Sequence, residues 1–136
     1  KLIGDGMLAI FPLDDPAFRP YVCRKALDAA RDAERAIDAL NRIRAGDGKP
    51  ALRFGFALHV GDVMYGNIGV PQRLEFTVIG KAANEAARLE GMCKELGEPI
   101  LISSAFQCCH PKRTRSLGTH SLRGISEPQE IFTLAP

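Results

Sequence analysis

The junction at Gly80, where a strand turns into a helix, constrains the fold of this chain more than any other feature of the sequence. The sequence predicts a strand over 74–79 and a helix over 81–96. Asn84 and Arg88 stand four residues apart, so they share one face of that helix. An amide and a guanidinium on one face suit a ligand that carries phosphate oxygens, because arginine offers a planar fork of donors. The alternative is a solvated helix face, which is the commoner setting of an arginine.

Predicted strands and helices alternate on both sides of this junction. Before it, the sequence predicts strands over 1–3 and 7–11 in a hairpin around Gly4-Asp5-Gly6, a helix from Tyr21 to Ala45, and strands over 52–60 and 63–68 joined by a tight turn at Gly61-Asp62. After it, the sequence predicts a strand over 99–103, a short helix over 104–109, and a closing hairpin of strands over 115–122 and 130–134. This order fits an α/β fold of the α+β kind, with helices packed on a mixed or antiparallel sheet.

Two patterns indicate which residues of these elements are buried. The predicted helix over 21–45 has a stripe at helical spacing that we expect to be buried, namely Val22, Ala26, Ala29, Ala33, Ile37, Leu40 and Ile43. The predicted strand over 52–60 places His59 among small residues on one face. A buried, hydrogen-bonded histidine is a commoner role for such a residue than catalysis.

The composition is that of an ordinary soluble globular domain, with 136 residues, 46% of them hydrophobic and 25% charged. A net charge of +2 gives no case for a nucleic acid or an anionic membrane as partner. No apolar run approaches membrane-spanning length, so we expect a cytoplasmic domain, with membrane association of the parent protein left open. The cysteines are Cys23, Cys93, Cys108 and Cys109. Because the neighbouring side chains of Cys108, Cys109 and His110 seldom converge on one ion, we expect reduced thiols rather than a zinc site.

Four blocks of sequence occur in a fixed order along the chain. They are Lys1 to Phe11; Ala57 to Gly61 with Gly66 to Gly69 and Arg73; Phe76 to Glu90; and Leu122 to Ile125 with Ile131 to Leu134. Together they resemble the catalytic domain of class III nucleotidyl cyclases. The resemblance covers nearly the whole chain and implies a ferredoxin-like core. It also implies a single catalytic domain over 1–136 that is truncated at its N-terminus, because one of the family's two metal-binding aspartates lies on a strand upstream of the hairpin.

The resemblance implies an adenylate cyclase, in which the ribose 3′-hydroxyl of ATP attacks the α-phosphate to form 3′,5′-cyclic AMP and pyrophosphate. The implied cofactors are two divalent cations, Mg²⁺ or Mn²⁺, and Asp5 matches one of the two aspartates that bind them. Asn84 matches the asparagine that orients the ribose, and Arg88 the arginine that stabilises charge on the phosphoryl oxygens. Arg123 stands where the family often has a basic residue for the terminal phosphates.

Lys1 and Thr77 match the pair of residues that reads the purine in this family. An ammonium donates to an adenine ring nitrogen and a hydroxyl can accept from the adenine amino group, whereas guanylate cyclases typically have Glu and Cys at these places. Many adenylate cyclases have Asp at the second place. The resemblance is therefore to the threonine-type subgroup of adenylate cyclases.

The family's active sites are composite, because the metal ligands come from one subunit and the base-reading pair, asparagine and arginine from the other. The resemblance therefore implies a homodimer with two sites. We expect the 136 residues alone to be inactive, because the upstream metal-binding aspartate is missing from them. Regulatory domains elsewhere in the parent chain fit this picture. The alternative is a cyclase-like dimerisation or nucleotide-binding module without catalysis. The presence of Lys1, Asp5, Asn84 and Arg88 together favours the enzyme.

Overall fold

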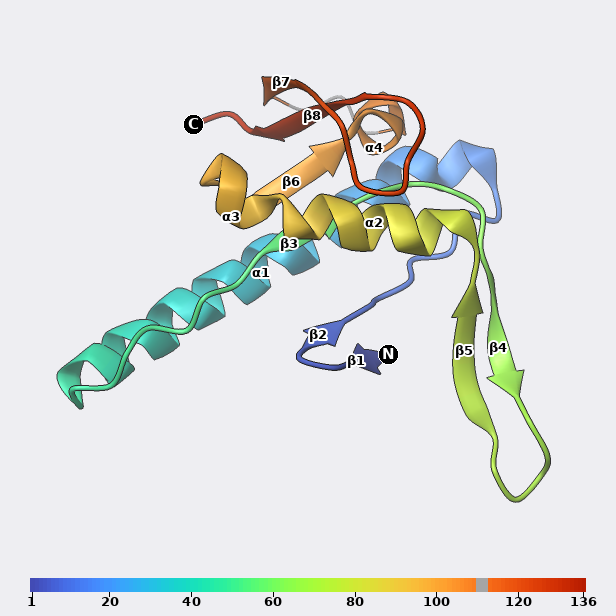
Figure 1. Cartoon of the computed structure of the whole chain (residues 1–136), viewed down its shortest axis with the longest axis horizontal. Helices are drawn as coiled ribbons and strands as arrows, with labels where there is room; N and C mark the ends of the chain where they lie inside the picture. The colour runs from blue at the N-terminus through green and yellow to red at the C-terminus, as the bar shows by residue number, and fades with distance from the viewer. Residues whose placement is uncertain (110–112) are drawn as a thin grey trace.

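A mixed four-stranded sheet lies at the centre of the molecule, which a computed structural model describes for residues 1–109 and 113–136 (Figure 1). The strand order is β3-β6-β8-β7, with bounds β3 Phe56–Leu58, β6 Ile100–Ser103, β8 Gln129–Leu134 and β7 Thr114–His120. β3 runs parallel to β6, whereas β8 runs antiparallel to both β6 and β7. The predicted α/β class, with helices on a mixed sheet, is confirmed.

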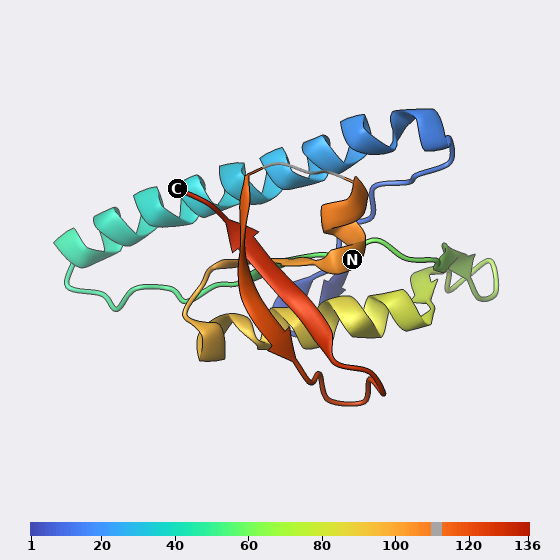
Figure 2. The ribbon, with the colours of Figure 1, turned by 90° about the horizontal axis from the view of Figure 1, so that it is seen from above.

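Helices cover both faces of this sheet. They are α1 Arg19–Gly46, α2 Lys81–Gly91, α3 Cys93–Leu96 and α4 Ser104–Cys109, and the short helix η1 Pro16–Phe18 precedes α1. Figure 2 shows α1 on one side of the sheet and α2 on the other. The predicted helix over 81–96 is broken at Met92 into α2 and α3, and it ends as expected at Gly97, which has the left-handed conformation.

β6 is buried on both faces because its side chains alternate between two hydrophobic clusters. Ile100 and Ile102 pack with Phe106 of α4 and with one stripe of α1, made of Cys23, Ala26, Leu27 and Ala30. Leu101 points the other way and packs with Leu89, Cys93, Leu122 and Ile131. The strand therefore joins the helices of the two faces into one core.

The predicted buried stripe of α1 is only partly right. Ala26 is buried and Val22, Ala33 and Ile37 are half-buried, but Ala29, Leu40 and Ile43 are exposed. The reason is that the second half of α1 extends beyond the sheet, and the chain that follows lies along it. Asn41 holds that chain by two hydrogen bonds to the backbone of Leu52, one donated at 3.0 Å and one accepted at 2.7 Å. Residues 52–55 are therefore not part of β3, and the strand predicted over 52–60 is confirmed only over 56–58.

The tight hairpin turn predicted at Gly61-Asp62 is wrong. β3 pairs with β6, and β4 Met64–Ile68 pairs instead with β5 Glu75–Ile79 in a separate antiparallel hairpin. Gly61 serves close packing rather than a turn, because a Cβ there would lie 2.5 Å from the Cβ of Ala82 on α2. The chain consequently passes along α2 and leaves the sheet instead of returning to it.

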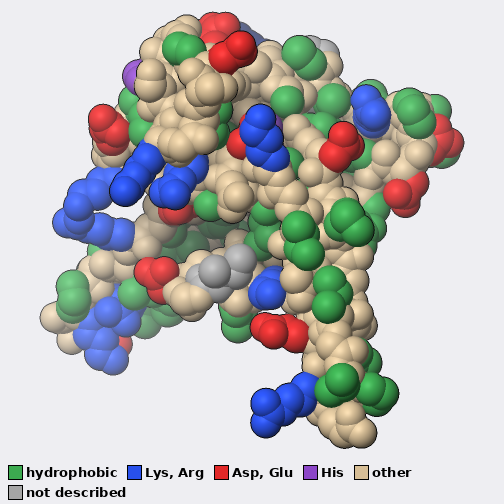
Figure 3. Space-filling view, turned by 45° about the vertical axis from the view of Figure 1, so that its right-hand side comes forward, with side chains coloured by type: hydrophobic (Ala, Val, Ile, Leu, Met, Phe, Trp, Pro, Cys, Tyr) green, Lys and Arg blue, Asp and Glu red, His purple; other side chains and the backbone are tan. Residues whose placement is uncertain are grey.

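The β4–β5 arm, residues 64–79, projects from the body and carries many exposed apolar side chains (Figures 1 and 3). They are Met64, Tyr65, Ile68, Val70, Leu74, Phe76 and Ile79. The register runs without a bulge from Met64 opposite Ile79 to Ile68 opposite Glu75. Gly69 allows a close approach of the backbone at the end of the arm, since a Cβ there would collide with the carbonyl of Arg73.

At the start of the chain, β1 Leu2–Ile3 and β2 Gly6–Met7 form the predicted hairpin in shorter form. At its end, the predicted pairing of β7 with β8 is confirmed, with a register shift between Ser116 and Thr119. The structure describes no helix that is long and apolar enough to cross a membrane. The four cysteines are free thiols, while His110 lies outside the described residues.

Replacing Ile131, which has no exposed surface, should destabilise the protein far more than replacing an exposed isoleucine. We expect Ile131→Ala to lower the free energy of unfolding by about 2–5 kcal/mol, because it leaves a cavity at the side of the sheet covered by α2. The matched control is Ile43→Ala on α1, where the residue is 64% exposed and the change should stay within about 0.5 kcal/mol. Urea unfolding measures both, and equal effects would contradict the described core.

Candidate functional site

Asn84 and Arg88 lie on the exposed side of α2, as the sequence predicts. Within the described residues neither side chain makes a hydrogen bond or an ion pair to the protein. The inward side of the same helix is formed by Ala82 and Leu89, which are buried. The amide and the guanidinium are therefore both available to a ligand on one face of a helix whose opposite side is fixed in the core.

Gly80 places the start of α2 against the chain that leads into the arm. Its φ of +149° lies in the region that favours glycine, and a Cβ there would lie 2.9 Å from the carbonyl oxygen of Asp62 and 3.1 Å from the Cα of Val63. A side chain would push β5 and α2 away from residues 62–63. The strand that carries Thr77 and the helix that carries Asn84 consequently meet at a fixed junction.

Lys1 and Thr77 lie close to each other through Glu75. The Lys1 ammonium is 3.8 Å from a carboxylate oxygen of Glu75. Glu75 and Thr77 are two residues apart on β5, so they share one face of the strand. The Thr77 hydroxyl donates to the backbone carbonyl of Glu75 at 3.2 Å. Lys1 and Thr77 are thus each in contact with Glu75, Lys1 at its carboxylate and Thr77 at its backbone carbonyl.

Asp5 and Arg123 stand apart from these residues. Asp5 lies at the exposed tip of the β1–β2 turn, and Arg123 is exposed in the segment between β7 and β8. Among the residues that the structure describes, no hydrogen bond or ion pair joins either of them to Asn84 or Arg88. The six predicted site residues therefore do not form a single connected cluster within one chain.

Asp5 fits one ligand position of a metal site and no more. In the described ranges, no three His, Cys, Asp or Glu side chains lie close enough to hold a metal ion together. Mg²⁺ at nucleotide sites commonly takes one or two carboxylates and completes its shell with phosphate oxygens and water. An exposed carboxylate at a turn suits that arrangement, but further ligands have to come from elsewhere.

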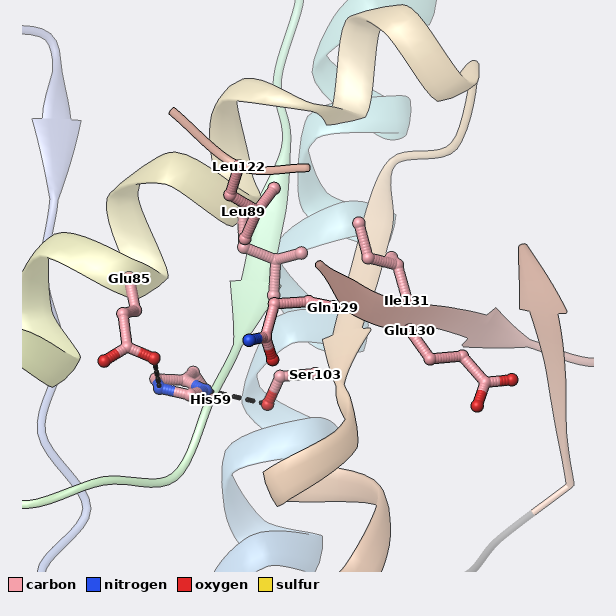
Figure 4. Close-up of a pocket in the computed structure, with 8 residues that line it drawn as sticks. All are labelled: His59, Glu85, Leu89, Ser103, Leu122, Gln129, Glu130 and Ile131. Carbon is pink, nitrogen blue, oxygen red and sulfur yellow. Dashed lines mark hydrogen bonds and ion pairs between the residues drawn. The ribbon is translucent and has the colours of Figure 1, made fainter. Parts of the chain in front are cut away.

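A polar bridge lies beneath α2 and joins it to the sheet (Figure 4). The Nδ1 atom of His59 is 2.8 Å from the hydroxyl of Ser103, and the Nε2 atom is 3.4 Å from a carboxylate oxygen of Glu85. Ser103 in turn accepts a hydrogen bond from the backbone N–H of Phe106 at 3.2 Å. We call these three side chains, Glu85, His59 and Ser103, the polar bridge. The expectation of a hydrogen-bonded histidine is confirmed, and the His59 side chain is largely but not fully buried, with 11% of its surface exposed.

The contacts of the polar bridge favour one tautomer of His59. Burial lowers the pKa of His59 below 6.5, and the Glu85 carboxylate opposes this shift without reversing it. The imidazole is therefore neutral at neutral pH and carries one proton. If the Ser103 hydroxyl donates to Nδ1, the proton resides on Nε2 and faces the Glu85 carboxylate. Donors and acceptors then match along the whole bridge.

The cavity beside the polar bridge is too small for a substrate. Its volume is about 10 Å³, and its lining includes Glu85, Leu89, Leu122, Gln129 and Glu130. Such a space holds at most about one water molecule. The polar bridge therefore supports α2 from inside, and the cavity beside it has no room for a nucleotide-sized ligand.

Sequence reasoning singled out His59 but missed Glu85 and Ser103. A signal for Glu85 was available, because it stands three residues after Ala82 and four before Leu89, on the inward side of the helix. A carboxylate on that side needs a polar partner. Ser103 gave no comparable signal, since only the parallel pairing of β3 with β6 brings it near His59.

No protein-family model matches the chain. Over 133 residues, 95% of the chain, it is 34% identical to Adenylate cyclase 1 of Rhizobium meliloti (strain 1021). It is 38% identical over 109 residues, 77% of the chain, to Adenylate cyclase of Anabaena cylindrica. These alignments cover 19% and 20% of the two relatives, so the chain spans about a fifth of their length.

Among solved structures, the crystal structure of the guanylyl cyclase Cya2 has the same fold, with a TM-score of 0.67 and 24% sequence identity. The match covers 83% of this chain and 57% of that chain. A ferredoxin-like cyclase core, expected from the sequence, is thereby confirmed as the fold.

The lowered pKa of His59 predicts how stability depends on pH. Because the unfolded chain binds the proton more tightly than the folded protein, the contribution from neutral His59 is complete above pH 6.5. It is lost as the pH falls from 6.5 towards the folded-state pKa. Urea unfolding at a series of pH values should therefore show a fall in stability below about pH 6.5 that is smaller in His59→Gln. An equal fall in both proteins would contradict a buried, neutral His59.

Proposed function

Because this chain belongs to the family of class III nucleotidyl cyclase catalytic domains, we propose that its parent protein is an adenylate cyclase that converts ATP to 3′,5′-cyclic AMP and pyrophosphate. The observation that carries the proposal is the placement of Asn84 and Arg88 on the exposed face of α2, where neither side chain has a hydrogen-bond or ion-pair partner among the described residues. α2 directly follows the strand of Thr77. The two relatives named adenylate cyclase support it. We propose that the domain continues upstream of Lys1, with the second metal-binding aspartate there.

Arg88 and Asn84 would act mainly in the transition state. As the ribose 3′-oxygen attacks the α-phosphorus, negative charge builds on the phosphoryl oxygens and on the leaving pyrophosphate. The Arg88 guanidinium would donate to the phosphoryl oxygens, and the Asn84 amide would hold the ribose so that its 3′-oxygen faces the phosphorus. Arg123 would bind the terminal phosphates. Donors held rigidly on a helix accelerate the reaction because they need not reorganise as charge develops.

Asp5 would hold the divalent cations together with the upstream aspartate and the phosphates. Two such cations, when bound, would lower the pKa of the attacking hydroxyl and neutralise charge on the leaving pyrophosphate. The protein's own contribution at this point is an exposed carboxylate on a short two-residue turn.

Lys1 and Thr77 would select adenine. The Thr77 hydroxyl donates its hydrogen bond to the carbonyl of Glu75, so its oxygen is left to accept one from the adenine amino group. Guanine presents a carbonyl oxygen at that place, which would face another acceptor. The named relatives are adenylate cyclases and a structural neighbour is a guanylyl cyclase, so the choice of base would depend on these side chains and not on the fold.

A homodimer would bring Asp5 of one subunit to Asn84 and Arg88 of the other. The β4–β5 arm supports this assembly, because its apolar side chains are exposed in the single chain, with Met64 75% exposed. Contiguous exposed apolar surface commonly marks an interface. A twofold dimer would have two equivalent composite sites.

The test of function is cyclic nucleotide production by the parent protein that extends upstream of Lys1, with Mn²⁺ and either ATP or GTP. We expect cyclic AMP from ATP, at least about tenfold less product from GTP, and no product from residues 1–136 alone. No product from the folded, dimeric parent with either nucleotide would favour a cyclase-like module without catalysis.

Composite sites predict complementation between two inactive variants of the parent. Asp5→Ala and Arg88→Ala should each abolish activity as homodimers. Heterodimers formed by mixing them contain one site with both residues intact. Half of the dimers are then heterodimers with one working site, so the mixture should regain about a quarter of the wild-type rate. Mixing each variant with itself is the control, and failure of the exchanged mixture to regain activity would contradict composite sites.

A further inference from the structure

We infer that His59 is a positioning residue for the proposed reaction: by joining Glu85 of α2 to Ser103 at the end of β6, it fixes the rotation of α2 and hence the direction of Arg88. The inference rests on the proposed function. The two contacts reach His59 from opposite sides, with Nδ1 towards the sheet and Nε2 towards the helix (Figure 4).

The end of the polar bridge at the sheet is firmly anchored. Ser103 is the last residue of β6 and is buried, with 8% of its surface exposed. Its hydroxyl is tied both to His59 at 2.8 Å and to the backbone N–H of Phe106 at 3.2 Å. His59 itself directly follows β3, which pairs with β6. The imidazole is therefore a fixed part of the sheet edge, from which a contact to α2 can define a direction.

The other contacts that hold α2 on the sheet are mainly apolar. The helix has a glycine at its N-terminal cap and a break at Met92, so neither end is a rigid continuation of another helix. Its buried residues are Ala82 and Leu89. Apolar packing is non-directional, and alanine has no side chain long enough to interlock. A contact between a carboxylate and an imidazole N–H is directional. The polar bridge is thus the contact best suited to set the rotation.

The geometry of a helix links this rotation to the ligand-binding face. Successive residues are about 100° apart, so Glu85 lies one step from Asn84 and three from Arg88. A small rotation of α2 about its axis turns Asn84 and Arg88 by the same angle. The contact of Glu85 with His59 would prevent such a rotation. Misplacement of about 1 Å at a catalytic group can lower a rate by about 100-fold. The 3.4 Å separation of Nε2 and Glu85 Oε2 is long for a hydrogen bond, and such contacts often tighten when ligand binds.

Other charged groups near His59 are already engaged. On the β8 side, Gln129 and Glu130 line the same small cavity. The Glu130 carboxylate accepts a hydrogen bond from the Ser116 hydroxyl at 2.7 Å, which holds it towards β7. The carboxylate that contacts the imidazole is therefore that of Glu85, and Glu85 is the residue to change.

The experiment is steady-state kinetics of the parent protein with ATP. Glu85→Ala removes the acceptor, and we expect kcat to fall about tenfold or more while KM for ATP changes less than about twofold. Glu85→Gln keeps an oxygen that can accept from Nε2, so its kcat should stay within about threefold of the wild type. Glu95→Ala, which removes an exposed carboxylate from α3, is the matched control and should be unchanged. His59→Ala and the double variant His59→Ala/Glu85→Ala should both resemble Glu85→Ala, because all three lack the same contact.

Three results would overturn the inference while leaving the proposed function intact. They are an active Glu85→Ala enzyme with the kcat of Glu95→Ala, a Glu85→Gln enzyme as impaired as Glu85→Ala, and additive losses in the double variant. If the polar bridge served only to stabilise the fold, the variants that lose activity would lose thermal stability to the same degree. If the wild-type parent makes no cyclic nucleotide from ATP or GTP, the proposed function fails, and the role of the polar bridge in this reaction fails with it.

Discussion

Burial of β6 on both faces is the constraint on which the rest of the structure depends. A strand of four residues supplies Ile100 and Ile102 to one hydrophobic cluster and Leu101 to the other. Alternation along a strand makes this possible, and it leaves no side of β6 for water. α1 and α4 are held on one face, and α2 and α3 on the other. The exposed face of α2 is consequently presented by a helix whose inner side belongs to the core.

The same strand explains why a polar group is buried so close to apolar clusters. Ser103 ends β6, where the hydroxyl caps the backbone of α4 and meets His59 from the neighbouring parallel strand. Burying these groups is tolerable because each finds a partner. A fully apolar contact at this place would hold α2 to the sheet without defining its rotation. In the role that we propose for it, the polar bridge adds a directional contact to the apolar packing that holds α2 on the sheet.

Local signals predicted much of the fold, and pairings between distant segments explain what they missed. The strand-to-helix junction at Gly80, the stop at Gly97 and the closing hairpin follow from glycine chemistry and short-range patterning. The turn predicted at Gly61 failed because a glycine that allows close packing against Ala82 looks the same in sequence as one that allows a turn. The stripe predicted on α1 failed at Leu40 and Ile43 because periodicity does not indicate where the sheet ends. At the site, residue types identified Asn84 and Arg88, whereas Glu85 and Ser103 required the tertiary structure.

The β4–β5 arm has a consequence for how such a molecule could be controlled. A two-stranded hairpin is marginally stable in water by itself, and within the described residues the arm pairs with no third strand. A well-ordered arm therefore requires a partner that packs on its apolar side chains. β5 carries Thr77 and leads through Gly80 into α2, so a partner that covers the arm also contacts the strand next to the exposed face of α2. If a second copy of the chain covers these side chains, the order of the arm depends on the local concentration of the protein. A flanking segment that brings two copies together or holds them apart would then control it.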